Sequence, residues 1–317
     1  MTAATVVKEI WRYPVKSMAG ERLERSEVGE RGLWGDRGWA VRNDDTGEIH
    51  NAKRFPVLMQ CSARYRTPPG EDQIPDVDIT LPDGEALGTD SARLRTRLSE
   101  LMGRPVSLRR LEPATNRKYY RRDQPGAALI GRLAASRTLR RLIQRVVEGQ
   151  LRVEFGREPD EPMPDLGNMT SDVFEFYTPP GTYFDVLPIH VISTSAMQTM
   201  RMIDLAASWD VRRFRPNVLI ETATDQGHVE RNWVGHTVQI GGFAIRGEMP
   251  TIRCAMTMHA QNELPRDPLV LRAIVRDADQ CLGLYASVVV TGTVSVGDPV
   301  TLGRRSSLAH NAFEKQA

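Results

Sequence analysis

Short alternating segments separated by turn residues constrain the fold of this chain most strongly. Residues 76–87 (DVDITLPDGEAL) alternate apolar and polar side chains around a Pro-Asp-Gly turn, which predicts a β-hairpin. Residues 237–248 and 285–303 are also strand-like, with glycine turns, and the last run is typical of the closing strands of a small barrel. We therefore expect a mixed β/α fold that is predominantly β.

The same pattern divides the chain into four parts. Residues 1–110 form a β-rich unit with one amphipathic helix, which Gly103 ends. Residues 111–180 connect the two β-rich regions and contain a helix-like run and a Pro-rich run. Residues 181–305 form the core of a second β-rich domain, and residues 306–317 form a C-terminal tail.

The bulk composition excludes several classes of protein. The formal net charge is only +2, so nothing demands a nucleic-acid or membrane partner. The basic-aromatic run at 116–126 is typical of single-stranded nucleic-acid binding or of a solvated loop, and we favour the loop. Three cysteines with no close pair indicate a reducing compartment, so we expect a cytoplasmic protein without its own iron–sulfur cluster.

Two turns near the N-terminus carry the components of an anion site. In residues 13–20 (YPVKSMAG), Lys16 and Ser17 follow a strand, and a lysine, a hydroxyl and turn N–H groups together bind anions. In residues 35–41 (GDRGWAV), Arg37 lies between glycines, where its guanidinium could bind phosphate with two hydrogen bonds. A solvated lysine and a surface Asp-Arg pair are the alternatives.

Two further groups of polar residues lie in the C-terminal half. Ser193, Thr194 and Ser195 stand at a strand-to-helix junction, where they either bind an anion or simply cap the helix, with Thr194 or Ser195 as N-cap. Arg213, Arg215 and Asn217 occupy alternate positions of a segment that Pro216 predicts to be extended. Their side chains would therefore point to one side, either toward an anion or into solvent.

Cys254 stands out because its neighbours are polar. Arg253 precedes it, and a positive neighbour favours the thiolate that nucleophilic or metal-binding cysteines use. His259 follows at a distance that cannot fix a pairing, and it is a candidate acid–base group or a surface histidine. A buried inert thiol is the alternative for Cys254, and we expect Cys61 and Cys281 to be structural.

The order of these motifs resembles the MOSC family (molybdenum cofactor sulfurase C-terminal). The matching runs are YPVKS, GDRGWAV, FDVLPIHVISTSAM, RFRPNVLIE, the Arg-Cys pair and the closing strands. The resemblance implies an N-terminal β-barrel-like domain, a MOSC β-barrel domain and a cofactor cleft between them. It implies that Cys254 ligates molybdenum, and that the cofactor contacts are Lys16, Ser17, Arg37, Ser193, Thr194, Ser195, Arg213, Arg215, Asn217 and Arg253.

The function that this resemblance implies is reductive. It is a molybdenum-cofactor (Mo-molybdopterin) oxidoreductase that reduces a small N-hydroxylated or other N–O substrate, with Cys254 as a catalytic residue. From its side-chain chemistry alone, we expect His259 to be a second catalytic residue. Its electrons would come from a separate flavin reductase, ferredoxin or cytochrome. Residues 254–268 (CAMTMHAQNELPRDP) depart from the family pattern, however. A persulfide sulfurtransferase using Cys254, a specialised biosynthetic enzyme and a cofactor-delivery module are therefore the alternatives.

Overall fold

The computed structural model of the chain describes residues 5–122, 136–166, 175–222 and 227–305. Strands outweigh helices in it, which confirms the predicted mixed, predominantly β fold. The predicted tail at 306–317 lies outside the described ranges. Within those ranges, no helix has both the length and the apolar character needed to cross a membrane.

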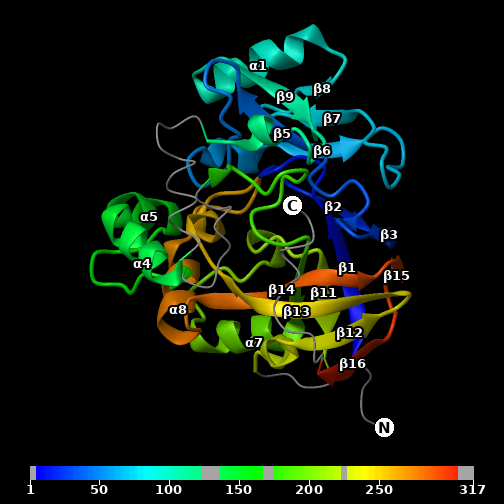
Figure 1. Cartoon of the computed structure of the whole chain (residues 1–317), viewed down its shortest axis with the longest axis vertical. Helices are drawn as coiled ribbons and strands as arrows, with labels where there is room; N and C mark the ends of the chain where they lie inside the picture. The colour runs from blue at the N-terminus through cyan, green and yellow to red at the C-terminus, as the bar shows by residue number, and fades with distance from the viewer. Residues whose placement is uncertain (1–4, 123–135, 167–174, 223–226, 306–317) are drawn as a thin grey trace.

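One eight-stranded sheet forms the lower part of the molecule (Figure 1). Its strands follow the order β16-β12-β13-β14-β10-β11-β1-β2, and β10 and β11 are the one parallel pair among them. The strands are β1 (Val6–Arg12), β2 (Glu21–Leu23), β10 (Ile189–Ser193), β11 (Val218–Glu221), β12 (His236–Ile240), β13 (Phe243–Ile252), β14 (Cys281–Val290) and β16 (Val300–Arg305).

The first strand of the chain lies among the strands of the C-terminal region. β1, dark blue in Figure 1, pairs antiparallel with β11, and β3 (Arg25–Gly29) pairs with β15 (Gly292–Ser295) and with β4 (Gly32–Leu33). The N-terminal strands therefore share a core with strands from the other end of the chain. The domain boundaries at 110, 180 and 305 stay predictions, but strand pairing crosses the first of them.

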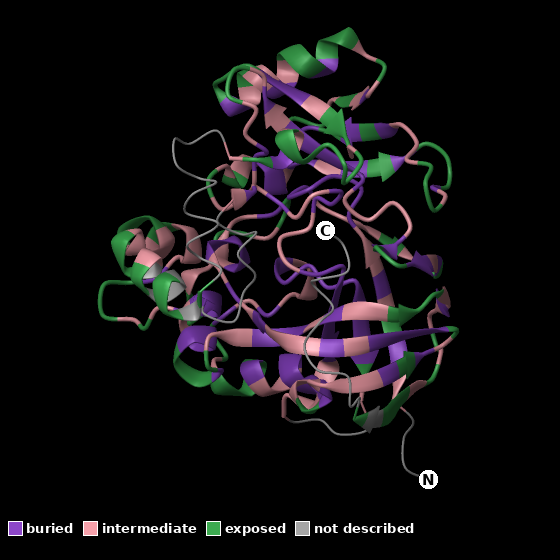
Figure 2. Cartoon of the chain, in the orientation of Figure 1, coloured by how far each residue is buried: buried purple, intermediate pink, exposed green. Residues whose placement is uncertain are grey.

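The two faces of the sheet pack against different partners. On β10, Ile189 and Val191 lie in the core enclosed by the sheet, whereas Ile192 packs against two helices on the other face. This alternation follows from the two-residue period of a strand. The helices are α7 (Thr194–Ile203) and α8 (Pro268–Asp277), of which α8 lies at the left end of the sheet in Figure 1. Figure 2 shows the buried residues gathered between these layers.

A smaller β-rich unit lies above the large sheet. The predicted hairpin at 76–87 is confirmed as β7 (Val77–Thr80) and β8 (Ala86–Gly88). The predicted helix is α1 (Ala92–Met102), which buries Leu94, Leu98 and Met102 and ends at left-handed Gly103. The other elements are β5 (Trp39–Asn43), η1 (Pro56–Gln60), β6 (Ser62–Tyr65) and β9 (Val106–Arg110).

The connecting segment is partly helical. Its elements are α2 (Arg117–Tyr120), α4 (Arg137–Val146) and α5 (Glu148–Phe155). The predicted solvated loop at 116–126 is wrong for Tyr120, because that side chain is fully buried against Tyr119 and Tyr183. The segment therefore contributes to the core through its aromatic residues, while 123–135 and 167–174 lie outside the described ranges.

Candidate functional site

A polar cavity lies where the N-terminal turns meet the ends of β10, β13 and β14. Its volume of about 70 Å³ exceeds the roughly 10–15 Å³ that one water needs, but lies below the roughly 300 Å³ of small-molecule pockets. The cavity as it stands therefore has room for a compact polar group. Most of the predicted site residues line it: Lys16, Ser17, Arg37, Arg213, Arg215, Asn217, Arg253 and Cys254.

The backbone around this cavity is strained. Six described non-glycine residues have a positive φ, and three of them line the cavity: Ser17 (68°), Arg37 (54°) and Arg215 (54°). A non-glycine residue in this conformation costs of order 1–3 kcal/mol, and such strain gathers at functional sites. The positions of these three side chains are therefore held by the surrounding structure against their own local preference.

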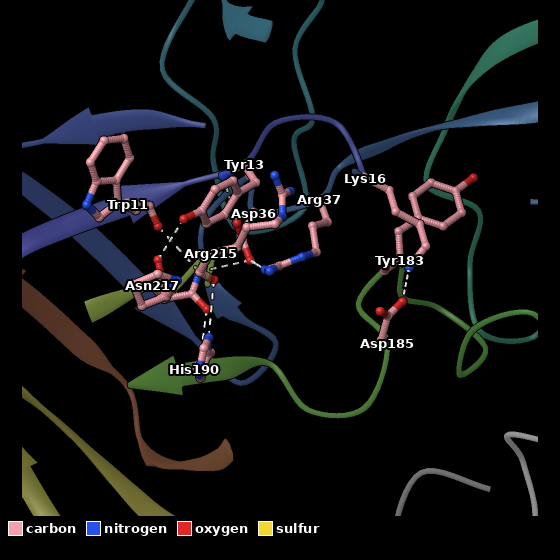
Figure 3. Close-up of polar contacts among 12 residues, drawn as sticks. Trp11, Tyr13, Lys16, Asp36, Arg37, Tyr183, Asp185, His190, Arg215 and Asn217 are labelled. Carbon is pink, nitrogen blue, oxygen red and sulfur yellow. Dashed lines mark hydrogen bonds and ion pairs between the residues drawn. The ribbon is translucent and has the colours of Figure 1, made fainter. Parts of the chain in front are cut away.

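Lys16 forms one wall of the cavity through an ion pair that the sequence did not predict. Its ammonium group donates to the Asp185 carboxylate and to the Tyr183 carbonyl (2.8 Å), as Figure 3 shows. Burial lowers the pKa of Lys16, although Asp185 opposes that shift. Burial would raise the pKa of Asp185, but Lys16 and Lys53 outweigh it and hold that pKa far below its ordinary value.

Asp36 links the two N-terminal turns to the large sheet. Its carboxylate accepts from the Tyr13 backbone N–H (2.8 Å) and from the Asn217 side chain (3.0 Å), and it pairs with Arg37 (Figure 3). Burial would lower the pKa of Arg37, but the Asp36 carboxylate outweighs it and raises that pKa. Asn217 also accepts from the His190 backbone N–H, so Asp36 and Asn217 hold the cavity walls together.

Arg215 and Arg253 differ from Lys16 and Arg37 because the described residues give them no carboxylate partner, and they differ from Arg213 because each keeps a buried N–H without an acceptor. Both side chains are buried, and burial lowers the pKa of Arg215 to about 10 and also lowers that of Arg253. Arg215 Nη2 and Arg253 Nε are buried and have no hydrogen-bond acceptor among the described atoms. A buried donor without an acceptor costs roughly 1–3 kcal/mol. The cavity therefore presents two uncompensated positive charges with free donors.

His190 is a site residue that the sequence analysis missed. Its Nδ1 lies 3.3 Å from the Arg215 carbonyl, which can only accept, so Nδ1 carries the proton. Its Nε2 then accepts from Arg253 (3.4 Å). Burial holds the pKa of His190 well below its ordinary value, and Arg253 adds to that effect. A histidine interrupting the apolar strand at 189–193 was the available sequence signal.

Cys254 lies at the end of the cavity, half-buried, where β13 leads into the short helix η5 (Ala255–Met258). Its side chain packs against Ala52, Met59 and Met256. Its carbonyl accepts from the Thr257 N–H and hydroxyl, which fixes the turn after the cysteine. Among the residues that the structure describes, no three His, Cys, Asp or Glu side chains gather into a metal-binding group.

Arg213 lines the cavity, but its guanidinium group stabilises the surrounding backbone. It donates to the carbonyls of Ser208 (3.0 Å), His259 (3.2 Å) and Pro265 (2.8 Å) and is fully buried. The predicted extended segment is wrong, since Val211–Arg213 form the 3-10 helix η3 and Arg215 is left-handed. Arg213 and Arg215 therefore do not share one face of a strand.

The three hydroxyl residues at the start of α7 do not line the cavity. Ser193, and not Thr194 or Ser195, is the N-cap, because its Oγ accepts from the Ala196 N–H (3.1 Å). Its hydroxyl also donates to the buried Glu230 carboxylate of η4 (Val229–Trp233), so the protein supplies its own acidic group there. Burial raises the pKa of Glu230.

His259 also lies outside the cavity. It ends η5, and its side chain is not among the groups that line the space next to Cys254. Burial lowers the pKa of His259, and Arg266 adds to that shift. Its described contact with the cavity lining is made by its backbone carbonyl, which accepts from Arg213 (3.2 Å), and not by its imidazole.

The fold and site define a β-rich protein with a cation-lined cavity between its N-terminal turns and its large sheet. Two family models match the chain: the MOSC N-terminal beta barrel domain over residues 4–108 and the MOSC domain over residues 181–301. The chain therefore belongs to the MOSC-domain family, as the order of its motifs predicted.

Comparisons with individual proteins add little to this family assignment. The chain is similar to the YuaD protein from Bacillus subtilis, with 10% identity, coverage of 95% of this chain and 96% of that one, and a TM-score of 0.42. It is also similar to YiiM from Geobacillus stearothermophilus, with 17% identity, coverage of 38% and 56%, and a TM-score of 0.28. No curated protein matches the chain.

Proposed function

We propose that this protein is a molybdenum-cofactor-dependent oxidoreductase that reduces N-hydroxylated or other N–O substrates. The observation that carries the proposal is the pair of buried arginines, Arg215 and Arg253, in one cavity with Cys254. Each has a buried donor without an acceptor, so the cavity favours an anionic group. Because the chain belongs to the MOSC family, we infer that this anion is the phosphate of the molybdenum cofactor.

The charges around the cavity fit a phosphate. Asp36 pairs with Arg37, and Asp185 is shared by Lys16 and Lys53, so these carboxylates offset part of the positive charge around the cavity. Arg215 and Arg253 remain, and two positive charges match a phosphate that carries close to two negative charges. Lys16, Ser17, Arg37, Arg215 and Arg253 would hold this end of the cofactor.

Cys254 supplies the second group that the proposed cofactor needs, which is a ligand for its metal. A thiolate is a soft ligand that suits molybdenum, and Cys254 is the one cysteine at the cavity. When bound, the cofactor supplies two-electron oxygen-transfer chemistry. The residues of the chain bind and orient it: Thr257 fixes the turn that carries Cys254, and His190 holds Arg253 against the backbone of Arg215.

The reaction requires partners. Cleavage of an N–O bond consumes two electrons and two protons and releases water, so a small N-hydroxylated substrate and an electron donor must both reach the site. Three cysteines are too few for a four-thiolate iron–sulfur cluster. We therefore infer a separate electron-transfer protein, such as a flavin reductase, a ferredoxin or a cytochrome, and a cytoplasmic setting.

Sulfur transfer is the second candidate function. Cys254 is half-buried and lines the polar cavity, and the segment after it departs from the amidoxime-reducing pattern. Cys254 would then carry a persulfide, and the arginines would bind an anionic acceptor or the cofactor that receives the sulfur.

One experiment separates the two candidates. The full chain is purified from a host that makes molybdopterin, and the same sample is analysed for molybdenum and for sulfane sulfur. Near-stoichiometric molybdenum that is lost in Cys254→Ala supports the oxidoreductase and justifies assays with N-hydroxylated compounds. A persulfide on Cys254 without molybdenum contradicts it and supports sulfur transfer.

A further inference from the structure

Tyr13 contacts both Arg37 and Arg215, the two arginines of the cavity that have a positive φ. Its backbone N–H donates to Asp36 (2.8 Å), and its carbonyl accepts from the Arg37 N–H (2.7 Å). Its hydroxyl donates to the Pro216 carbonyl (3.0 Å), next to Arg215. Three separate hydrogen bonds therefore fix Tyr13 to the two turns that carry Arg37 and Arg215.

The ring of Tyr13 lies against both guanidinium groups. The Arg215 guanidinium carbon is 4.1 Å from the ring centroid, and that of Arg37 is 5.1 Å away. Both distances allow a cation–π attraction, which grows when the groups are removed from water. Tyr13 is only 2% exposed, so these contacts are dry. Figure 3 shows the ring next to both arginines.

The backbone of Gly20 packs closely against the ring of Tyr13. Gly20 lies so close that a Cβ there would be 2.5 Å from Tyr13 Cδ1, which no side chain tolerates. Tyr13 also lines a second cavity of about 570 Å³ that shares Arg215 with the first. Arg215 therefore lies at the boundary of the two spaces, and the ring of Tyr13 contacts it from the side of the larger one.

We propose that Tyr13 is a positioning residue for anion binding, and that the electron-rich face of its ring holds Arg37 and Arg215 in their binding positions. Two guanidinium groups near one another repel, and each has a strained backbone. The ring offsets the repulsion, so the arginines do not have to be reorganised when an anion arrives. This inference rests on the proposed function, because it takes the polar cavity to be the site that binds the phosphate of the cofactor.

The test varies the charge distribution of the ring without changing its shape. Phenylalanine and fluorinated phenylalanines are introduced at position 13 of the full chain, produced in a host without molybdopterin. The probe is inorganic phosphate, titrated by calorimetry, with thermal unfolding measured on each variant. We expect Tyr13→Phe to bind within about twofold of the parent, and successive fluorination to weaken binding to about tenfold below it. Tyr13→Leu should lose at least as much.

The outcomes separate the inference from the function on which it rests. If phosphate affinity stays constant along the fluorinated series but is lost in Arg215→Ala, the role of Tyr13 is overturned and the assignment of the cavity as a phosphate site stands. A parent protein that does not bind phosphate overturns both. Unfolding temperatures that stay constant along the series show that lost affinity comes from the ring and not from the fold.

Discussion

Arg213 and Arg215 are separated by one residue and are both buried, yet their guanidinium groups have opposite surroundings. Three backbone carbonyls accept from Arg213, whereas Arg215 donates to the Met18 carbonyl and keeps Nη2 without an acceptor. The first arginine therefore stabilises the fold, and the second is available to a ligand. This difference can be tested by substituting each residue.

Arg215→Ala should lower cofactor occupancy. Loss of a charge-assisted contact to a buried phosphate costs about 1.5–3 kcal/mol, or roughly 10- to 150-fold in affinity. Pterin and molybdenum content are measured on protein purified under limiting cofactor. Arg212→Ala is the matched control, because Arg212 pairs with Asp210 and Glu263 instead. Full occupancy in Arg215→Ala would contradict the site.

Arg213→Lys should lower stability. A lysine cannot reach all three carbonyls, and each buried acceptor left without a donor costs about 1–3 kcal/mol. Urea unfolding should show a loss of at least about 2 kcal/mol. Phosphate affinity of the fraction that remains folded should be unchanged, since the guanidinium of Arg213 faces the carbonyls. Unchanged stability with lost phosphate binding would reverse the roles of the two arginines.

Cys254→Ala should abolish molybdenum binding and N–O reduction. Cys281→Ser is the control, because Cys281 lies outside the polar cavity and burial raises the pKa of its thiol. Pterin should remain measurable in Cys254→Ala at reduced affinity, since the arginines hold the phosphate. Molybdenum retained at the parental level in Cys254→Ala would exclude the thiolate as its ligand.

His50 should make the fold sensitive to acid. Burial lowers its pKa to about 4, and Arg104 and Arg54 add to that shift, while Glu48 lies 3.9 Å away. The unfolded chain takes up this proton near pH 6.5 and the folded chain only near 4. Stability from this group is therefore complete above about pH 6.5 and falls between 6.5 and 4, by about 2 kcal/mol at pH 5.

The check for His50 is urea unfolding at pH 7 and pH 5. His50→Leu should show a smaller difference between the two pH values than the parent chain does. His236→Gln is the control, because His236 is half-buried on strand β12. An equal pH dependence in His50→Leu and in the parent would show that other groups cause it.

Gly20→Ala should destabilise the fold, because the new methyl group would lie 2.5 Å from the Tyr13 ring and 2.7 Å from the Arg12 carbonyl. Displacing packed groups costs typically about 1–3 kcal/mol. Gly149→Ala is the control: its methyl meets nothing within 4 Å, and in helix α5 it should stabilise by up to about 1 kcal/mol. A Gly20→Ala variant as stable as the parent would show that the Tyr13 ring is free to move.

The sequence predicted the elements whose local patterns are strong. The hairpin at 76–87 and the helix that ends at Gly103 follow from turn chemistry and helical periodicity, and both are present. Cys254, Lys16 and Arg37 were found because polar groups beside a thiol or in a turn are visible locally, and the cavity brings them together.

The other site predictions depended on positions that tertiary contacts decide and the local sequence does not. Pro216 favours an extended predecessor, but hydrogen bonds from Tyr13 and His190 to the Arg215–Pro216 carbonyls hold Arg215 left-handed. Glu230 reaches the α7 N-terminus from η4, and only the tertiary fold places it there. His259 was a reasonable acid–base candidate by type, yet the course of the chain leaves it outside the cavity.

The pairing of β1 with β11 has a consequence for how the protein is made. On the ribosome, Val6 and Val7 emerge long before their partners Glu221 and Ile220, so one edge of β1 must wait for β11 while its other edge can already pair with β2. The cavity also needs Cys254 and Tyr285, which emerge later still. The anion-binding cavity is therefore complete only after almost the whole chain has been synthesised, so a ligand that needs all of its walls binds after translation.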